Sequence, residues 1–206
     1  MFSCKTQLLE QKRTYVSEEN AANATLKDTS NATFYFIRHA EAKTNEKNPH
    51  LSGDGLKRTH LWARFFENKK VDTVFTTNLN RTLTTAETIA KKKKVPIAFY
   101  DPFQLDYDGF VEKYKNKSLI IVGHSNTTPN FVNKIAATHE YSQMVDKNYS
   151  DVYTVVILNG KVISHHVARL EDEIQKMEDA KLSPKELKKV LKERKKAAKA
   201  KEKADR

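Results

Sequence analysis

The stretch Phe34-Tyr35-Phe36-Ile37-Arg38-His39-Ala40-Glu41 decides the fold predicted for this chain. Its first four residues form a continuous apolar run, which is typical of a strand buried on both faces in a parallel sheet. We expect a strand over residues 33–39, so that Arg38 and His39 come at its carboxyl end. Open α/β sheets bind ligands at the carboxyl ends of their strands. The stretch therefore predicts a parallel sheet with an anion site at this edge.

The segments on both sides of this stretch alternate between apolar runs and helical patterns. Asn159-Gly160 separates two further apolar segments and is a strong two-residue hairpin signal. This order predicts an α/β fold in three layers, with a largely parallel central sheet, helices on both faces and a closing antiparallel hairpin. The remaining strands are expected at residues 71–75, 96–100, 118–122, 152–158 and 161–167, and helices from Ser52, from Asn78 or Asn80 to Lys94, around Phe110 and over residues 128–137.

The length of 206 residues suits one hydrophobic core with additional segments. We expect a flexible leader or tether over residues 1–31, a folded domain over 32–170 and a charged helical tail over 171–206. An extra C-terminal helix is predicted there, because Ser183-Pro184-Lys185-Glu186 is a capping box with proline at the first helical position. This helix is expected to be solvated, to bind acidic partners or to pack against a second subunit.

The net charge of +11 favours anionic ligands or surfaces without identifying them. We expect no nucleic acid partner, because the sequence contains no helix-turn-helix, zinc-finger or RNP pattern. The single cysteine, Cys4, excludes an internal disulfide and a cysteine-based metal site. Met1-Phe2-Ser3-Cys4-Lys5 resembles the end of a bacterial lipoprotein signal, which would make Cys4 a lipid anchor and the protein an envelope lipoprotein. The alternative is a disordered N-terminus on a cytoplasmic protein.

Two more polar side chains are expected at the edge that carries Arg38 and His39. Arg81 follows the second strand and His124 follows the fourth. The carboxyl ends of neighbouring parallel strands are adjacent, so these side chains can line one pocket. Arginine binds phosphate through two hydrogen bonds, and a neutral imidazole can attack phosphorus. The set therefore predicts phosphoryl-transfer chemistry, with the arginines keeping His39 neutral below its usual pKa of roughly 6.5.

These segments resemble the motifs of the histidine phosphatase superfamily, also called phosphoglycerate mutase-like. The resemblance covers about residues 33–168 and follows the family's order and approximate spacing. The matching segments are Arg38-His39-Ala40-Glu41, Leu51-Ser52-Gly53-Asp54-Gly55, Thr77-Asn78-Leu79-Asn80-Arg81-Thr82-Leu83-Thr84-Thr85-Ala86 and Gly123-His124-Ser125-Asn126.

The resemblance implies a role for each matching residue. His39 corresponds to the nucleophile that becomes phosphohistidine, while Arg38, Arg81 and His124 correspond to the groups that hold the phosphoryl oxygens. Asn45 corresponds to a further phosphate contact found in some members. The chemistry implied needs no metal and no cofactor.

The resemblance also implies a general acid, a glutamate or aspartate between the second arginine and the second histidine. We assign it to Asp101, which directly follows the third expected strand, with Asp106 and Asp108 as alternatives. Asp101-Pro102 can also be read simply as the start of a turn, because aspartate favours such positions.

Only 42 residues lie between Arg81 and His124, which leaves little room for the cap that mutases and sugar phosphatases insert there. The chain therefore resembles the compact, SixA-like branch of the family. This branch implies a phosphatase with an open pocket, acting on small phosphate esters or on protein phosphohistidine. Three alternatives stay open: a catalytically weak module that binds phosphate or phosphoprotein, a phosphoglycerate-type mutase, and a basic scaffold that acts through its tail.

Overall fold

A computed structural model describes residues 31–44 and 47–204. Cys4, the leader over residues 1–30 and Asn45 lie outside these residues, so the expectations for them stay predictions. Among the helices of the described residues, none is long and apolar enough to cross a membrane.

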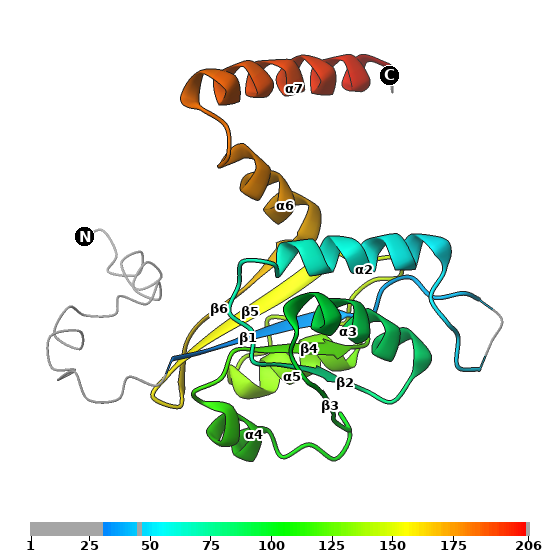
Figure 1. Cartoon of the computed structure of the whole chain (residues 1–206), viewed down its shortest axis with the longest axis vertical. Coiled ribbons are helices and arrows are strands. Elements are labelled where there is room, and N and C mark those ends of the chain that lie inside the picture. The colour runs from blue at the N-terminus through cyan, green and yellow to red at the C-terminus, as the bar shows by residue number, and fades with distance from the viewer. Residues whose placement is uncertain (1–30, 45–46, 205–206) are drawn as a thin grey trace, which may run out of the picture.

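The described residues form one six-stranded sheet in the order β3-β2-β4-β1-β5-β6 (Figure 1). The first four strands in this order run parallel, β5 is antiparallel to β1, and β6 is antiparallel to β5. This confirms the predicted α/β fold with a largely parallel sheet and a closing hairpin. The strands are β1 (Asn31–Arg38), β2 (Thr73–Thr76), β3 (Ile97–Phe99), β4 (Leu119–Gly123), β5 (Asp151–Leu158) and β6 (Lys161–Arg169).

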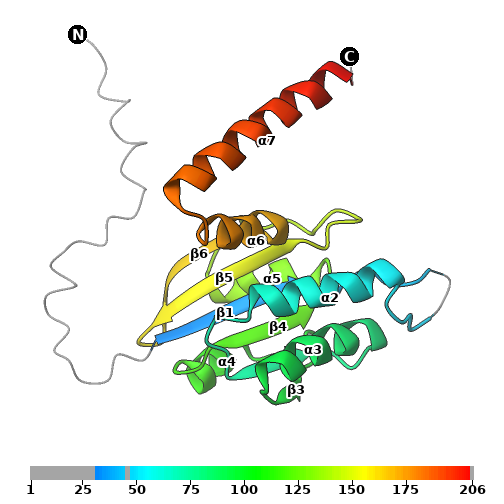
Figure 2. The same ribbon diagram turned by 45° about the horizontal axis from the view of Figure 1, so that its top comes forward.

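Helices cover both faces of the sheet, as Figure 2 shows. Phe34 and Phe36 of β1 belong to the core cluster under α4 and α5, while Ile37 belongs to the cluster under α2, α3 and α6. Successive residues of a strand face opposite sides, so one apolar run contributes to both cores. The helices are α2 (Gly53–Phe65), α3 (Asn80–Lys93), α4 (Tyr107–Tyr114), α5 (Thr127–Ile135), α6 (Leu170–Asp179) and α7 (Pro184–Ala204).

The predicted start of the first helix is confirmed, and that of the second is wrong. Ser52 caps α2, because its hydroxyl accepts a hydrogen bond from the Gly55 N–H at 3.1 Å. The prediction that Asn78 or Asn80 caps α3 is wrong, since the cap is Leu79. The side-chain amide of Asn80 instead donates to the Asn48 carbonyl at 2.8 Å and so ties α3 to the loop that precedes α2.

The hairpin between β5 and β6 turns at Asn159 and Gly160, as the sequence predicts. Both have positive φ, +50° and +75°, which is the conformation that a type I′ turn requires. The turn fixes β6 at the edge of the sheet, with its C-terminal end leading directly into α6.

The tail contains two helices rather than the one predicted. Leu170 of α6 is fully buried, and Ile174 and Met177 pack against the core beneath α2. The residues at 170, 174 and 177 form a helical apolar stripe, and three acidic residues in the first turn complement the helix dipole. α6 is therefore packed on the sheet domain, and α7 projects beyond it (Figure 1).

Candidate active site

Three parallel strands place the predicted site residues at one edge of the sheet. Arg38 is paired with Gly123 across β1 and β4, and Thr76 is paired with Val122 across β2 and β4. The His39 N–H extends this ladder by donating to the Gly123 carbonyl at 3.0 Å. The residues that follow these strands therefore start from adjacent positions.

His39 presents its Nε2 atom to the site. Its Nδ1 lies 2.7 Å from the Ala40 carbonyl oxygen, which can only accept, so Nδ1 carries the proton and Nε2 carries the lone pair. Arg81 Nε donates to Nε2 at 3.2 Å. His39 is 6% exposed, so its Nε2 atom is largely shielded from water.

A threonine network fixes the orientation of His124. Its Nε2 lies 3.1 Å from the Thr77 hydroxyl, which lies 2.9 Å from the Thr82 hydroxyl. The Thr82 hydroxyl also lies 2.9 Å from the backbone carbonyls of Thr77 and Leu79. Thr82 can donate its one proton to a carbonyl or to the Thr77 hydroxyl, so the network accepts both neutral tautomers of His124. The ring centroid of His124 lies 5.6 Å from that of His39.

Arg38 is held by the loop that precedes β5, a contact that the sequence motifs did not predict. Its guanidinium donates to the Asn148 carbonyl at 3.2 Å and lies 4.2 Å from the centre of the Tyr149 ring. The same ring is 5.9 Å from that of His39. Since Ile37 is paired with Val152 across antiparallel β1 and β5, the loop before β5 must reach this edge. That topology was the signal that could have indicated Tyr149.

Arg38 retains an unused donor. Its Nε is buried and has no hydrogen-bond partner among the described residues. A buried donor without a partner is costly, so an oxyanion that reached it would be stabilised. Arg38 can therefore donate its Nε–H to an anion bound at this edge of the sheet.

Both imidazoles are neutral in this environment near pH 7. The pKa of His39 is lowered to about 3, mainly by burial and also by the positive charges of protonated His124, Arg81 and Arg38, while the Ala40 hydrogen bond opposes this change. Burial also lowers the pKa of His124 to about 4, with Arg81 and Arg38 contributing. His39 therefore keeps its Nε2 lone pair at neutral pH.

Residues 34–104 match the model of the histidine phosphatase superfamily (branch 1). The predicted resemblance to the histidine phosphatase superfamily is confirmed. The match includes Arg38, His39, Arg81 and Asp101, and it ends before His124. No curated protein matches the chain.

Solved structures of the superfamily share the fold. The protein histidine phosphatase SixA complexed with tungstate superposes with a TM-score of 0.57 and 13% identity, over 68% of this chain and 98% of that one. Bacillus stearothermophilus YhfR gives 0.52 at 16% identity, over 67% and 96%. The mycobacterial glucosyl-3-phosphoglycerate phosphatase gives 0.52 at 9% identity, over 68% and 98%. These likenesses show the fold alone.

Two of the three carboxylates considered for the general acid have local hydrogen-bond partners. Asp101 is exposed and accepts a hydrogen bond from the Phe103 N–H at 2.9 Å. Asp106 caps α4 by accepting from the Gly109 N–H at 3.1 Å, and Asp108 lies in the first turn of that helix. Among the described residues, no hydrogen bond or ion pair links these carboxylates to the cluster of Arg38, His39, Arg81 and His124.

The last residue of the opening motif also has a local partner. Glu41 Oε1 accepts from Arg58 Nε at 2.7 Å, and Arg58 Nη1 donates to Glu171 at 2.8 Å and to the Ser150 hydroxyl at 2.9 Å. This places Arg58 between the loop after β1, the loop before β5 and α6. Glu41 therefore supports the loop that follows His39.

Proposed function

We propose that this protein is a metal-independent phosphatase that forms a covalent phosphohistidine at His39. One observation carries the proposal: the Nε2 lone pair of a neutral, buried His39 lies beside Arg81, with Arg38 and His124 at the same sheet edge. Imidazole nucleophiles and arginine donors are what transfer of a phosphoryl group requires.

In the first step, Nε2 of His39 attacks phosphorus while the bond from phosphorus to the ester oxygen breaks. The Arg81 Nε–H, which now donates to Nε2, turns to a phosphoryl oxygen and frees the lone pair. The Nδ1–H bond to the Ala40 carbonyl stabilises the positive charge that develops on the ring. In the second step water attacks phosphorus and gives a proton to the carboxylate of the acid that protonated the leaving oxygen, while the bond between phosphorus and Nε2 returns its electrons to His39.

The nucleophile is tested with p-nitrophenyl phosphate in EDTA. His39→Ala is expected to lower kcat by roughly three orders of magnitude or more, because no other group would form the intermediate. His60→Ala, which removes an exposed imidazole from α2, is the matched control and is expected to retain full activity. Equal turnover by His39→Ala and the control would refute the His39 mechanism, and loss of all activity in EDTA would refute metal independence.

Asp101 is the acid that we propose for the leaving oxygen, since it directly follows the Tyr100 whose N–H continues the ladder from β2. Asp101→Asn is expected to slow hydrolysis of an alkyl phosphate by roughly 10²–10⁴-fold and that of p-nitrophenyl phosphate much less, because nitrophenolate leaves without protonation. Asp106→Asn tests the alternative acid in the same assays and keeps a residue that can cap α4. An Asp101→Asn protein with unchanged rates on both substrates would exclude the assignment.

The substrates that we propose are small phosphate esters or protein-bound phosphohistidine. Only α4 and its flanking loops occupy the interval between β3 and β4, so no inserted cap is available to enclose a small substrate. The fold shared with SixA, named as a protein histidine phosphatase, supports the same substrates. Turnover of phosphohistidine peptides against phosphoserine peptides would decide between them.

The hydrogen bond that Asp101 accepts from the Phe103 N–H favours one alternative, a module that binds phosphate or a phosphoprotein with weak catalysis. Such a module would bind vanadate competitively with phosphate and would turn over all of these substrates only very slowly. Loss of vanadate binding in Arg38→Ala would still locate the ligand at this edge.

A further inference from the structure

The tail helix α7 carries most of its charge on one face. Of its residues, ten are basic and three are acidic. Successive helix positions are separated by about 100°, which places seven lysines within one side of the helix. These form the lysine face: Lys185, Lys188, Lys189, Lys192, Lys195, Lys196 and Lys199.

The opposite side of α7 is fixed to the rest of the molecule. Arg194 donates to both carboxylate oxygens of Asp179, at 2.8 and 2.9 Å, and so anchors α7 to the end of α6. Leu187, Val190 and Arg194 are the half-buried residues of α7, at spacings of three and four. The middle of the lysine face lies on the opposite side of the helix from these three residues.

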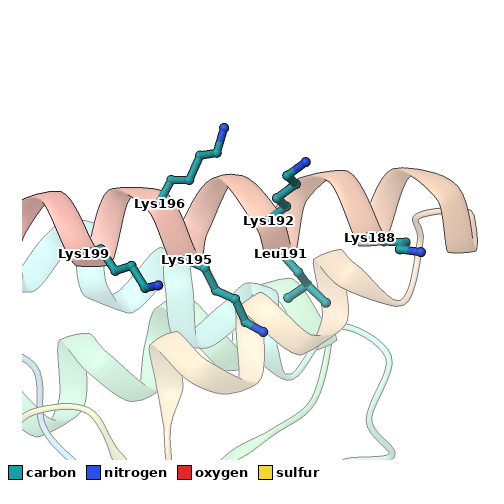
Figure 3. A pocket seen from close by; sticks show the side chains of 6 residues that line it. All are labelled: Lys188, Leu191, Lys192, Lys195, Lys196 and Lys199. Carbon is teal, nitrogen blue, oxygen red and sulfur yellow. The ribbon is translucent and has the colours of Figure 1, made fainter.

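The lysine face is free to meet a partner. All seven lysines are exposed, and none of them makes an ion pair or hydrogen bond with another residue of the described chain. Figure 3 shows Lys192 and Lys196 extending away from the ribbons of the domain, whereas Lys195, Lys199 and Leu191 extend on the side of the helix nearer to those ribbons. Seven like charges held together on one face repel one another, and an anionic surface would relieve this repulsion.

We propose that the lysine face binds the surface of an anionic lipid bilayer. Clusters of four to eight basic residues on a helix are attracted to anionic headgroups. Every one to two lysines raises the affinity for the membrane about tenfold. The lysine face is flat along the helix, so a planar surface can contact all of its charges together. The apolar side chain of Leu191, which is 44% exposed, lies next to the lysine face.

The positions of the acidic residues favour a plane over a nucleic acid groove. Glu186 and Glu193 lie beside the lysine face on one flank of the helix. The walls of a groove would bring phosphates against these carboxylates, whereas a plane leaves them in water. The lysine face also contains no arginine, asparagine, glutamine or aromatic side chain, which are the groups that read or stack on bases.

The test uses the full chain and vesicles of phosphatidylcholine with or without phosphatidylglycerol. The unchanged protein is expected to sediment with the anionic vesicles only and to be released by salt. The variant Lys188→Glu, Lys192→Glu and Lys196→Glu is expected to bind at least roughly a hundredfold more weakly. Circular dichroism checks that α7 remains helical in it.

The matched control reverses three exposed lysines elsewhere, Lys70→Glu, Lys91→Glu and Lys117→Glu, and has the same net charge. It is expected to bind the anionic vesicles within a few-fold of the unchanged protein. Equal weakening by both variants would overturn the proposal, since net charge would then explain binding. Failure of the unchanged protein to bind anionic vesicles would overturn it too. Tighter binding of duplex DNA than of vesicles at the same salt, lost in the α7 variant, would assign the face to nucleic acid instead.

Discussion

At the scale of single residues, the important property of His39 is that its imidazole carries no positive charge near pH 7. It is buried beside two arginines and a second imidazole, so its protonated form is disfavoured. Neutrality keeps the nucleophile ready at physiological pH, and it also removes the positive charge that would bind phosphate. The binding charge must therefore come from Arg38 and Arg81, which explains why both guanidinium groups lie at this edge.

The depressed pKa of His39 predicts a loss of stability in mild acid. Its pKa is about 3 in the folded state and roughly 6.5 in the unfolded chain, so the unfolded state binds the proton first as pH falls. The stability that neutral His39 contributes to the folded state is complete above pH 6.5 and is lost progressively from there towards pH 3. Between pH 7 and pH 5 this loss of stability amounts to about 2 kcal/mol.

Urea denaturation at pH 7 and pH 5 measures this effect. His39→Asn, which cannot be protonated, is expected to lose about 2 kcal/mol less than the unchanged protein over this interval. His60→Asn serves as the control, because its imidazole is exposed. An acid-induced loss in His39→Asn as large as in the control would contradict the depressed pKa.

At the scale of elements, the apolar runs and turn signals predicted each strand to within about two residues. Gly55 shows why one short motif is informative: a Cβ there would lie 2.0 Å from the Glu41 carbonyl oxygen, so only glycine allows α2 to pack against the loop after His39. Leu56 and Leu61 of α2 are apolar, yet they are 48% and 36% exposed. The apolar residues of the sequence therefore mark a wider stripe than the one that packs, since Trp62, Phe65 and Phe66 are the residues of this segment that join the core cluster.

The site illustrates what strand order can and cannot predict. Arg38, His39, Arg81 and His124 could be placed together because each follows a strand of the parallel sheet. Tyr149 could not, since its place depends on a loop whose conformation no local pattern specifies. Asp101 illustrates the opposite case, because its position after a strand left the direction of its side chain undetermined. In the structure that carboxylate accepts from Phe103 N–H, as a turn residue does.

At the scale of the whole molecule, α6 connects two regions of different character. Its Glu171 accepts hydrogen bonds from Arg58 and from the Ser150 hydroxyl, next to the Tyr149 that lies over Arg38. Its Asp179 holds α7. A single ten-residue helix thus supports the candidate active site at one end and presents the lysine face at the other.

This arrangement predicts that two truncations only eleven residues apart behave differently. A chain ending at Lys181 retains α6, so it is expected to keep the phosphatase kinetics of the full chain and to lose binding to anionic vesicles. A chain ending at Leu170 loses Glu171 and the packing of Ile174 and Met177. It is expected to be less stable by about 2 kcal/mol or more and to have a lower kcat/KM, because the loop that holds Arg38 loses its support. Thermal unfolding, p-nitrophenyl phosphate turnover and vesicle sedimentation measure the three effects on the same samples. Equal kinetics and stability in the two truncated chains would show that α6 does not support the site.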